Sequence, residues 1–396
     1  MNILFINKNE TWGGSAQVCQ ELINGLEAKG ISVSFFVDKK ESAKKNVFMI
    51  KNHKIKKFLS YLTSNDLDYY SGNDITKTDE FKKADIVHLH NISGHFFKLA
   101  TIKKIAETKP IVWTFHDMQP INHYFAHSFH ENPTLGLFTG ESPKIISNII
   151  WWNHIYLKLR KISIYRATNF NVISPSIWLQ KKIQKTYLKD KNIEVINNGI
   201  NEKIFQPGDK IAARKKLYLP IDKKIILTIS DSGKNNALKG WNFTKEVIAK
   251  LNLDDYIIIN IGNTQSWIEK NVIFIKKIQE KNLLKLYYQA ADLLLFPSLA
   301  ENFPLTILES MASGTPVVAF DVGGINEQID HKINGYLAKY KDSDDLINGI
   351  NFIYKCGQKN LSLKCREKII NHFTSELMTQ KYIELYKKIK IHENSN

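Results

Sequence analysis

Short apolar runs alternate with longer, more polar segments along the first half of the chain. The runs read ILFIN, ISVSFFV, DIVHLHN, PIVWTFHD, NFNVISPS and IEVINNG. Between the first two, residues 16–29 place apolar side chains at helical spacing and are followed by Gly30, as at the end of a helix. Lys8 and Glu10 interrupt the first run too early for a signal peptide, so we expect a buried strand there. Apolar strands that alternate with helices predict a parallel, doubly wound sheet.

The second half repeats this rhythm in the runs KIILTIS, YIIINIG, VIFIK, DLLLFPS and PVVAFD, without an internal sequence repeat. We therefore predict an α/β protein with two Rossmann-like domains. Turn residues in NNGINEKIFQP (197–207) mark the boundary, which gives domains at 1–200 and 201–375. A helical pattern begins at about Ser362, and we expect 376–396 to form a C-terminal helix with a frayed tail.

The composition is that of a globular protein. The 396 residues are 43% hydrophobic, which is enough for large cores, and 19 Gly and 10 Pro are too few to indicate disorder. No apolar run reaches the roughly 18 residues that a membrane helix needs. The three cysteines, Cys19, Cys356 and Cys365, are an odd number without metal-type spacing. They favour reduced thiols in a cytoplasmic protein.

The formal net charge is +16, and lysines are concentrated in parts of the first half. Eight lysines lie within residues 39–57, and smaller basic clusters occur at 98–104 and 158–161. A basic surface with aromatic residues nearby suits anionic lipid head groups at the inner face of the cell membrane. A simply solvated surface is the alternative. Nucleic acid is not expected as a partner, because no recognition motif accompanies the charge.

Residues 292–324 carry the pattern that is richest in chemistry. An apolar strand leads into a loop with Glu301, then into a short helix with Glu309 that ends at Gly314. A second strand, PVVAF, leads into Asp321 and a glycine pair. Free amides at a helix N-terminus suit a phosphate, and carboxylates accept hydrogen bonds from hydroxyls. A nucleoside diphosphate sugar would satisfy both.

This segment resembles the donor-binding motif of retaining glycosyltransferases of the GT-B fold, in particular glycosyltransferase family 4. The family pattern is two glutamates separated by seven residues, followed by a small-residue helix and a GTPVVA-like strand. The matching positions are Glu301, Glu309, Gly323-Gly324, Glu327 and Asn334-Gly335. The segment NNGINEKIFQP is similar to the family's interdomain linker. The resemblance implies an N-terminal acceptor-binding domain and a C-terminal nucleotide-sugar-binding domain that face each other across a cleft, with the last helix crossing back.

The resemblance also implies roles for this loop and helix. Glu309 would bind the ribose hydroxyls, and Glu301, a catalytic residue, would bind hydroxyls of the transferred sugar. The alternatives are an exposed first-turn glutamate and an ordinary loop acid. Many relatives have glycines at Asn302 and Pro304, and Pro304 cannot donate an N–H. The remaining donor-binding candidates in this loop and helix are Asn302, Phe303, Leu305 and Thr306, the last two through their amides.

Lys239 follows the strand KIILTIS and the polar loop DSGKNNA. The resemblance gives it the catalytic task of neutralising the departing diphosphate, and a solvated loop lysine is the alternative. Relatives usually add an arginine, but Ser230, which we keep as a donor-binding candidate, and Asp231 occupy that region here. Lys234, or a residue of the other domain, is a candidate for the second charge. We expect the loops near Gly262 and Ile278 to read the base, and they do not distinguish uracil from guanine.

Two elements of the first domain complete the candidate site. Gly13-Gly14 opens a helix after the first strand, where glycines let an anion approach the backbone, although this is not the GxGxxG fingerprint. His116-Asp117 matches the family's HD element, which puts His116 beside the donor sugar as a catalytic residue; a structural histidine is the alternative. The long segment 118–142 is assigned to acceptor recognition. The candidate acceptor-binding residues are Asp117, His123 and Tyr124.

No metal or other cofactor is expected. The triplet Asp342-Ser343-Asp344 resembles the DxD motif of metal-dependent transferases of another fold, but it begins DSDDLINGI and reads as a helix N-cap. The His-rich segment has no spacing that requires a metal.

The predicted function is retaining, metal-independent transfer of a hexosyl group from a UDP- or GDP-linked sugar. The acceptor would be a glycan or lipid-linked glycan in polysaccharide or lipopolysaccharide assembly. Two alternatives stay open. A nucleotide-sugar epimerase of the same fold would convert the donor without an acceptor, and a non-catalytic protein would bind the nucleotide sugar without turnover.

Overall fold

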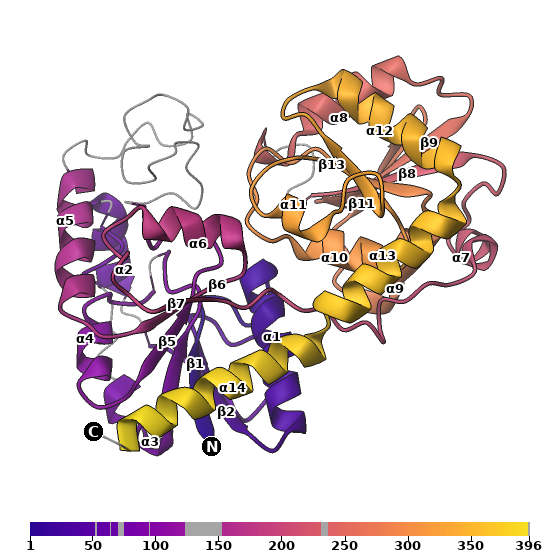
Figure 1. Cartoon of the computed structure of the whole chain (residues 1–396). Coiled ribbons are helices and arrows are strands. Elements are labelled where there is room, and N and C mark those ends of the chain that lie inside the picture. Colours follow the sequence, from indigo (N-terminus) through magenta and orange to yellow (C-terminus); the bar gives the residue numbers. More distant parts are fainter. Residues whose placement is uncertain are drawn as a thin grey trace. The chain divides into compact units, whose positions relative to one another are not determined.

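A computed structural model describes residues 1–51, 54–63, 65–69, 75–94, 96–122, 153–230 and 237–394 (Figure 1). The chain divides into two compact units. Unit 1 comprises Met1–Asn197 together with Met378–Asn396, and unit 2 comprises Asn198–Leu377. Each unit is a Rossmann-like α/β unit built on a parallel sheet, which confirms the predicted fold class.

The sheet of unit 1 has seven strands in the order β3-β2-β1-β4-β5-β6-β7, and all neighbours are parallel. The strands are β1 Asn2–Ile6, β2 Ser32–Val37, β3 Val47–Met49, β4 Ile86–Leu89, β5 Ile111–Thr114, β6 Asn171–Ser174 and β7 Ile193–Val195. The sequence pattern missed β3, because three residues at a sheet edge are too short to show a period. The strand order reverses direction between β1 and β4, and ligands bind at this position in such sheets.

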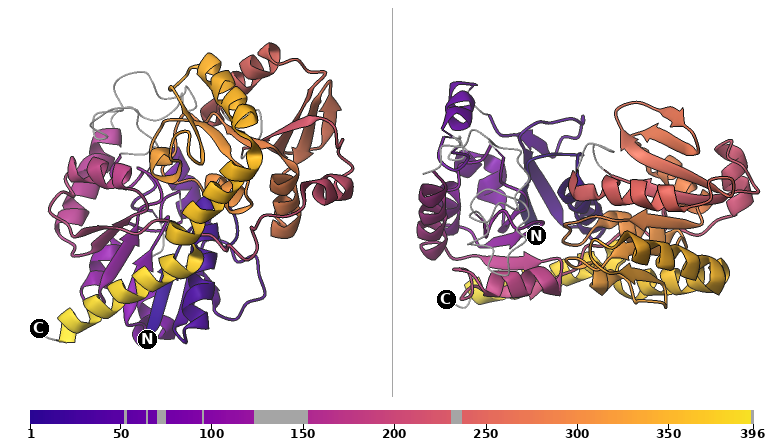
Figure 2. Two further views of the ribbon diagram at one scale, coloured as in Figure 1. Left: turned by 45° about the vertical axis from the view of Figure 1, so that its right-hand side comes forward. Right: turned by 90° about the horizontal axis from the view of Figure 1, so that it is seen from above.

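Helices cover both faces of this sheet. They are α1 Gly14–Ala28, α2 Lys54–Leu62, η1 Ile75–Lys77, α3 Asp79–Lys83, α4 Thr101–Ala106, α5 Asn153–Arg166, α6 Ile177–Gln184 and the later part of α14 Ser375–Asn394. The last helix lies along unit 1 in both views of Figure 2. Tyr386 bonds to His88 of β4 at 2.6 Å, and Tyr382 bonds to Thr114 of β5 at 2.8 Å. Buried hydroxyl and imidazole groups therefore attach the C-terminal helix to the sheet.

Unit 2 has a sheet of the order β10-β11-β9-β8-β12-β13-β14. The strands are β8 Lys224–Ile229, β9 Tyr256–Asn263, β10 Trp267–Glu269, β11 Val272–Lys276, β12 Leu293–Phe296, β13 Val317–Phe320 and β14 Gly335–Ala338. All neighbours are parallel except β10 and β11. The sequence pattern missed the edge strands β10 and β14. The strand order reverses between β8 and β12, so the loops that follow these two strands lie at the ligand-binding position.

Alternate side chains of the central strands pack into two separate hydrophobic cores in unit 2. Ile225 and Leu227 of β8 pack with α9 (Lys281–Ala290), α10 (Leu305–Ala312) and α13 (Gln358–His372), whereas Ile226 between them packs with α8 (Trp241–Lys250) and α12 (Ser343–Cys356). This period of two is what a strand covered on both faces requires. The helices of this unit are α7 Lys210–Lys216, η3 Ala237–Lys239, α8 Trp241–Lys250, α9 Lys281–Ala290, α10 Leu305–Ala312, α11 Ile325–Gln328, α12 Ser343–Cys356 and α13 Gln358–His372.

The helical pattern near the C-terminus is two helices, not one that starts at about Ser362. α13 begins earlier, at Gln358, and ends at His372; α14 begins at Ser375. Between them, the Phe373 carbonyl accepts from the Ile200 amide at 2.9 Å, and the Ser375 amide donates to the Ile200 carbonyl at 2.8 Å. This backbone pairing with Ile200 separates α13 from α14.

The prediction that Asp342 caps a helix is confirmed, because its carboxylate accepts from the Asp345 amide at the start of α12 at 3.0 Å. Asp344 and Asp345 lie in the first turn of that helix, where negative charge is favourable.

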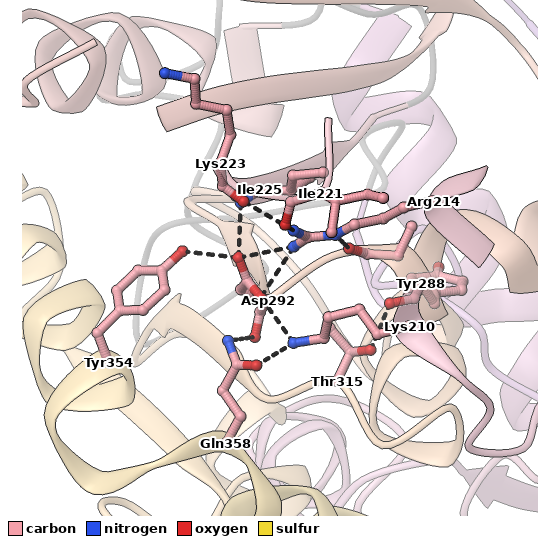
Figure 3. Close-up of polar contacts among 11 residues, drawn as sticks. Lys210, Arg214, Ile221, Lys223, Ile225, Tyr288, Asp292, Thr315, Tyr354 and Gln358 are labelled. Carbon is pink, nitrogen blue, oxygen red and sulfur yellow. Dashed lines mark hydrogen bonds and ion pairs between the residues drawn. The ribbon is translucent and has the colours of Figure 1, made fainter. Parts of the chain in front are cut away.

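A buried ion network joins α7 to the start of β12 (Figure 3). Arg214 donates to both carboxylate oxygens of Asp292 at 3.1 Å, and the Lys210 ammonium donates to the same carboxylate at 2.7 Å. The Ile225 amide of β8 adds a bond at 2.7 Å. Burial alone would raise the pKa of Asp292, but the charge of Lys210 and the hydrogen bonds from Lys210 and the Ile225 amide lower this pKa overall. The network therefore fixes β8 and β12 beside each other.

Among the described residues, none of the helices combines the length and apolarity needed to span a bilayer.

Candidate functional site

In the loop after β12, Glu301 contacts Lys239, which lies 62 positions earlier in the sequence. The Lys239 ammonium donates to Glu301 Oε1 at 2.6 Å, and the Ser298 hydroxyl donates to the same oxygen at 2.7 Å. Glu301 is only 8% exposed, and the Lys239 side chain is 26% exposed. Glu301 is therefore a buried, paired carboxylate and not an ordinary loop acid.

A glycine after Lys239 allows this contact. Gly240 has φ +71°, and a Cβ at this position would lie 1.7 Å from the Pro297 carbonyl oxygen. The Leu238 carbonyl accepts from the Leu299 amide at 2.8 Å. The turn η3 thus lies directly on the loop after β12, which places Lys239 at Glu301.

The loop after β13 holds the same segment through a second close backbone contact. Gly323 has φ +65°, and a Cβ there would lie 1.9 Å from the Glu301 carbonyl oxygen. The neighbouring Gly324 amide donates to the Asn302 carbonyl at 3.0 Å. Since the glycine pair follows β13 and Glu301 follows β12, adjacent strands of the sheet set the position of the carboxylate.

Gly323→Ala is expected to lower the free energy of unfolding by about 2–4 kcal/mol, the sum of left-handed strain and a steric clash. Donor-site affinity should fall as well, because the Glu301 backbone must move. Urea unfolding measures the first effect. Gly30→Ala is the matched control: Gly30 ends α1 in a left-handed conformation with φ +75°, and no described atom lies within 4 Å of the added Cβ, so this variant shows the strain alone. Equal losses in the two variants would contradict the proposed clash.

Glu309 lies beyond the first turn of α10 and is 7% exposed, which rules out an exposed first-turn glutamate. Tyr288 of α9 donates its hydroxyl to Glu309 Oε2 at 2.8 Å. Burial and the nearby carboxylate raise the pKa of Tyr288 well above its usual value, so this tyrosine stays a proton donor. Tyr288 was missed from the sequence, where Tyr287-Tyr288 reads as part of an ordinary helix.

Of the other candidates here, two were selected for their main-chain amides, and two have buried side chains. Leu305 and Thr306 are the first two residues of α10, which has no side-chain N-cap bond. Asn302 is buried. The Phe303 side chain packs against Phe373 in the core, with ring centroids 5.4 Å apart, and its carbonyl accepts from Asn198 at 3.0 Å.

Ser230 and Gly262 meet at the neighbouring strands β8 and β9. Gly262 has φ +117°, and a Cβ there would lie 1.7 Å from the Ser230 carbonyl oxygen. The Ser230 amide donates to the Ile261 carbonyl at 3.0 Å. Gly262 itself belongs to β9, which ends at Asn263, and the expected loop begins directly after it. Asp231 and Lys234 lie outside the described residues.

In unit 1, Gly13 and Gly14 lie where α1 begins after β1. Gly13 is the N-cap with φ +89°, and α1 has no side-chain N-cap bond. No described atom lies within 4 Å of a Cβ built on either glycine. The first amides of this 15-residue helix are therefore bordered by residues without side chains, as an anion site requires.

His116 pairs with a second histidine that the sequence reading did not select. His116 Nε2 lies 2.9 Å from His90 Nδ1, and the two rings are stacked with centroids 5.2 Å apart. Burial lowers the pKa of His116 to about 4 and also lowers that of His90, whose neighbours His88 and His116 lower it further. The pair is therefore neutral at pH 7, with one ring donating to the other. His90 directly follows β4 and lies two residues after His88, a spacing that already indicated a shared face in the extended run DIVHLHN.

Asp117 accepts from the Gln119 amide at 2.8 Å and closes a turn directly after His116. The candidate acceptor-binding residues His123 and Tyr124 lie outside the described residues.

Two sequence families match successive parts of the chain. The family described as "Glycosyltransferase Family 4" matches residues 12–203, and the family described as "Glycosyl transferases group 1" matches residues 209–372. An uncharacterized glycosyltransferase of Methanocaldococcus jannaschii is 25% identical over 363 residues, which cover 86% of this chain and 84% of that protein.

Several solved structures share the fold. Sucrose-phosphate synthase of Thermosynechococcus elongatus has a TM-score of 0.73 at 18% identity, with 98% of both chains covered. Anabaena HepE, solved in complex with UDP-glucose, has a TM-score of 0.69 at 17% identity, with 98% of this chain and 100% of HepE covered. WaaG, a glycosyltransferase involved in lipopolysaccharide biosynthesis, has a TM-score of 0.65 at 14% identity, with coverage of 96% and 98%.

Proposed function

Since the chain belongs to the family 4 glycosyltransferases of the GT-B fold, we propose that it moves a hexosyl group from a nucleoside diphosphate sugar to a glycan or lipid-linked glycan. The anomeric configuration would be retained.

The observation that carries the proposal is the grouping of Glu301, Glu309 and Lys239 around the start of α10 in unit 2. A nucleoside diphosphate sugar has a doubly charged diphosphate between two polyhydroxylated rings. The ammonium of Lys239 and the amides of Leu305 and Thr306 suit the diphosphate. The two buried carboxylates suit the hydroxyls on its two sides.

Glu309 is proposed to accept hydrogen bonds from the ribose, and Glu301 from the transferred sugar. Both carboxylates are already oriented by neutral or cationic donors, Tyr288 for Glu309 and Ser298 with Lys239 for Glu301. A carboxylate held in place before the ligand arrives loses little entropy on binding.

The departing diphosphate gains negative charge as the glycosidic bond breaks. Lys239 is proposed to stabilise that charge, which requires its ammonium to be shared between Glu301 and a phosphate oxygen. A cation held in a partly buried position needs no rearrangement at the moment of reaction, and this is where electrostatic stabilisation is most effective. No protein nucleophile is proposed.

Unit 1 is proposed to supply Gly13, Gly14, His116 and Asp117 to the donor sugar and acceptor. His116 is neutral at pH 7, so it can exchange hydrogen bonds with sugar hydroxyls but does not add a charge. His123 and Tyr124 are kept as acceptor-binding candidates.

UDP is the first nucleotide to test, since HepE was solved with UDP-glucose, and GDP is the second. A lipid-linked acceptor in surface glycan assembly is supported by the fold shared with WaaG and by the net charge of +16. That acceptor would place the protein in the cytoplasm at the inner membrane face, in peripheral contact with anionic lipid. Because the DxD-like triplet caps α12, we propose metal-independent transfer, which would continue in EDTA.

The direct test is donor binding followed by transfer. Calorimetry with a panel of UDP- and GDP-linked sugars should identify a donor, and the labelled sugar should then enter a lipid-extractable acceptor. Glu309→Gln should weaken donor binding by about 10–100-fold, because hydrogen bonds to a charged group are lost. Glu367→Gln, an exposed glutamate of α13, is the matched control. A donor that binds both variants equally would refute the role of Glu309, and binding of no sugar nucleotide would refute the proposed function.

A further inference from the structure

A cavity of about 220 Å³ lies in unit 2, at the edge of the sheet where the strands begin. Asp292 and Pro316, which directly precede β12 and β13, line this cavity. Gln358 and Lys359, the first two residues of α13, line it as well. One buried water needs only roughly 10–15 Å³, so the cavity has room for a small molecule.

The cavity is distinct from the proposed donor site. The candidate donor residues Leu305 and Thr306 begin α10, whereas Ser313 is the C-cap of that helix and lines the cavity. The eight residues of α10 separate the two places by about 12 Å. Glu301 likewise follows β12, whereas Asp292 precedes it. A ligand in the cavity would therefore leave the diphosphate position open.

Two serine hydroxyls at the cavity lack a hydrogen-bond partner in the described part of the chain. Ser313 is 4% exposed, and its hydroxyl is buried and unpaired. Ser362 lies one turn into α13 and is partly buried, with its hydroxyl next to Gly314. Buried polar groups of folded proteins nearly always have a partner, so an unpaired hydroxyl at a cavity indicates a polar ligand that would supply one.

Positive charge exceeds negative charge around the cavity. The Asp292 carboxylate already faces two cations, because Arg214 and Lys210 both donate to it (Figure 3). Lys359 adds an exposed ammonium that has no acidic partner among the described residues. The 15-residue helix α13 has no side-chain N-cap bond, so the partial positive charge of its first amides acts here too. These surroundings favour an anion over a neutral ligand.

We propose that the cavity binds a phosphate monoester. The phosphate lies at the first turn of α13, where the helix amides and the hydroxyls of Ser313 and Ser362 donate to its oxygens and Lys359 neutralises its charge. The remaining volume holds the organic group of the ester. This binding goes beyond the transfer reaction and does not depend on the identity of the sugar donor.

The test is calorimetric titration of the full chain with inorganic phosphate and with glucose 6-phosphate. The ester should bind more tightly, because its sugar fills volume that inorganic phosphate leaves to water. Combining Lys359→Ala with Ser362→Ala should weaken ester binding by about tenfold or more, since charge-assisted hydrogen bonds are lost. Lys364→Ala is the matched control: this exposed lysine of the same helix pairs with Glu367, does not line the cavity, and should be dispensable for binding.

Ser313→Ala removes only the buried hydroxyl. Because this hydroxyl has no partner to lose among the described residues, the melting temperature of the free variant should equal that of the wild type. Its affinity for the ester should fall about threefold or more, since one hydrogen bond to the phosphate is lost. A lower melting temperature with unchanged ester affinity would make the hydroxyl a structural group and overturn the proposal.

Saturating UDP should leave the ester affinity unchanged, and so should Lys239→Ala, because the donor site lies at the other end of α10. Displacement of the ester by UDP would place the phosphate in the donor site and overturn the proposal, as would equal ester affinities of the wild type and the double variant. Binding of inorganic phosphate without the ester, or of neither at millimolar concentration, would also overturn it. UDP binding to the double variant reports on the donor site separately, so failure of the cavity site and failure of the proposed function are distinguishable.

Discussion

Replacing Lys239 by alanine is expected to lower kcat for sugar transfer by about 10²–10³-fold, the usual loss when one preorganised group that stabilises developing charge is removed. Its ammonium is held 2.6 Å from Glu301 and is partly buried, so its charge is screened less than that of a surface lysine. The donor Kd should change less than kcat, because negative charge on the leaving diphosphate increases as the bond breaks. Steady-state kinetics with a saturating donor, together with calorimetric Kd values, measure the two effects.

Lys250→Ala is the matched control for this prediction. Lys250 lies in the same unit and forms an exposed ion pair with Asp344 at 2.6 Å, so its loss should leave kcat unchanged. A Lys239→Ala enzyme with normal kcat would contradict the role in leaving-group stabilisation. A rise in donor Kd with kcat unchanged at saturating donor would instead make Lys239 a binding residue.

Replacing Asp292 by alanine is expected to lower the free energy of unfolding by about 3–5 kcal/mol, because it leaves a buried cation without its partner. Arg214 is 5% exposed and donates twice to Asp292, and Lys210 donates to the same carboxylate (Figure 3). The carbonyls of Ala290, Ile221 and Lys223 hold the rest of the guanidinium in place, so it cannot turn to water without breaking them. Urea unfolding followed by circular dichroism measures the loss.

The control for Asp292 is an ion pair of the same unit that is open to solvent. Glu367 pairs with Lys364 at 2.9 Å, with both side chains about half exposed, and Glu367→Ala should cost at most about 0.5 kcal/mol. If the two variants lost equal stability, the network of Figure 3 would contribute no more than a surface ion pair.

The close-range parts of the candidate site could be predicted from the sequence. Glu301 and Glu309 share one loop and helix, and the Asp342 cap involves neighbours only a few positions apart. The partners that orient the carboxylates could not be predicted. Tyr288 bonds to Glu309 from another helix, and Lys239 reaches Glu301 only because Gly240 lets two loops touch. The hydrophobic periodicity carries no information on such pairs, because each pair depends on the order in the sheet of the strands that separate its two residues in the sequence.

The sequence alone determined the buried central strands, because a strand covered on both faces needs an uninterrupted apolar run that is visible in any order of packing. It also determined the family, through a motif whose residues are contiguous. Only the tertiary structure decided the rest. Edge strands such as β3 and β10 form only by pairing with a single neighbouring strand, and the helix break at Phe373 depends on pairing with Ile200. The spacing of apolar residues in α2 indicates an apolar side, whether that side faces the core or the solvent. Only the packing, with Ser60 buried and Phe58 exposed, decides which side meets water.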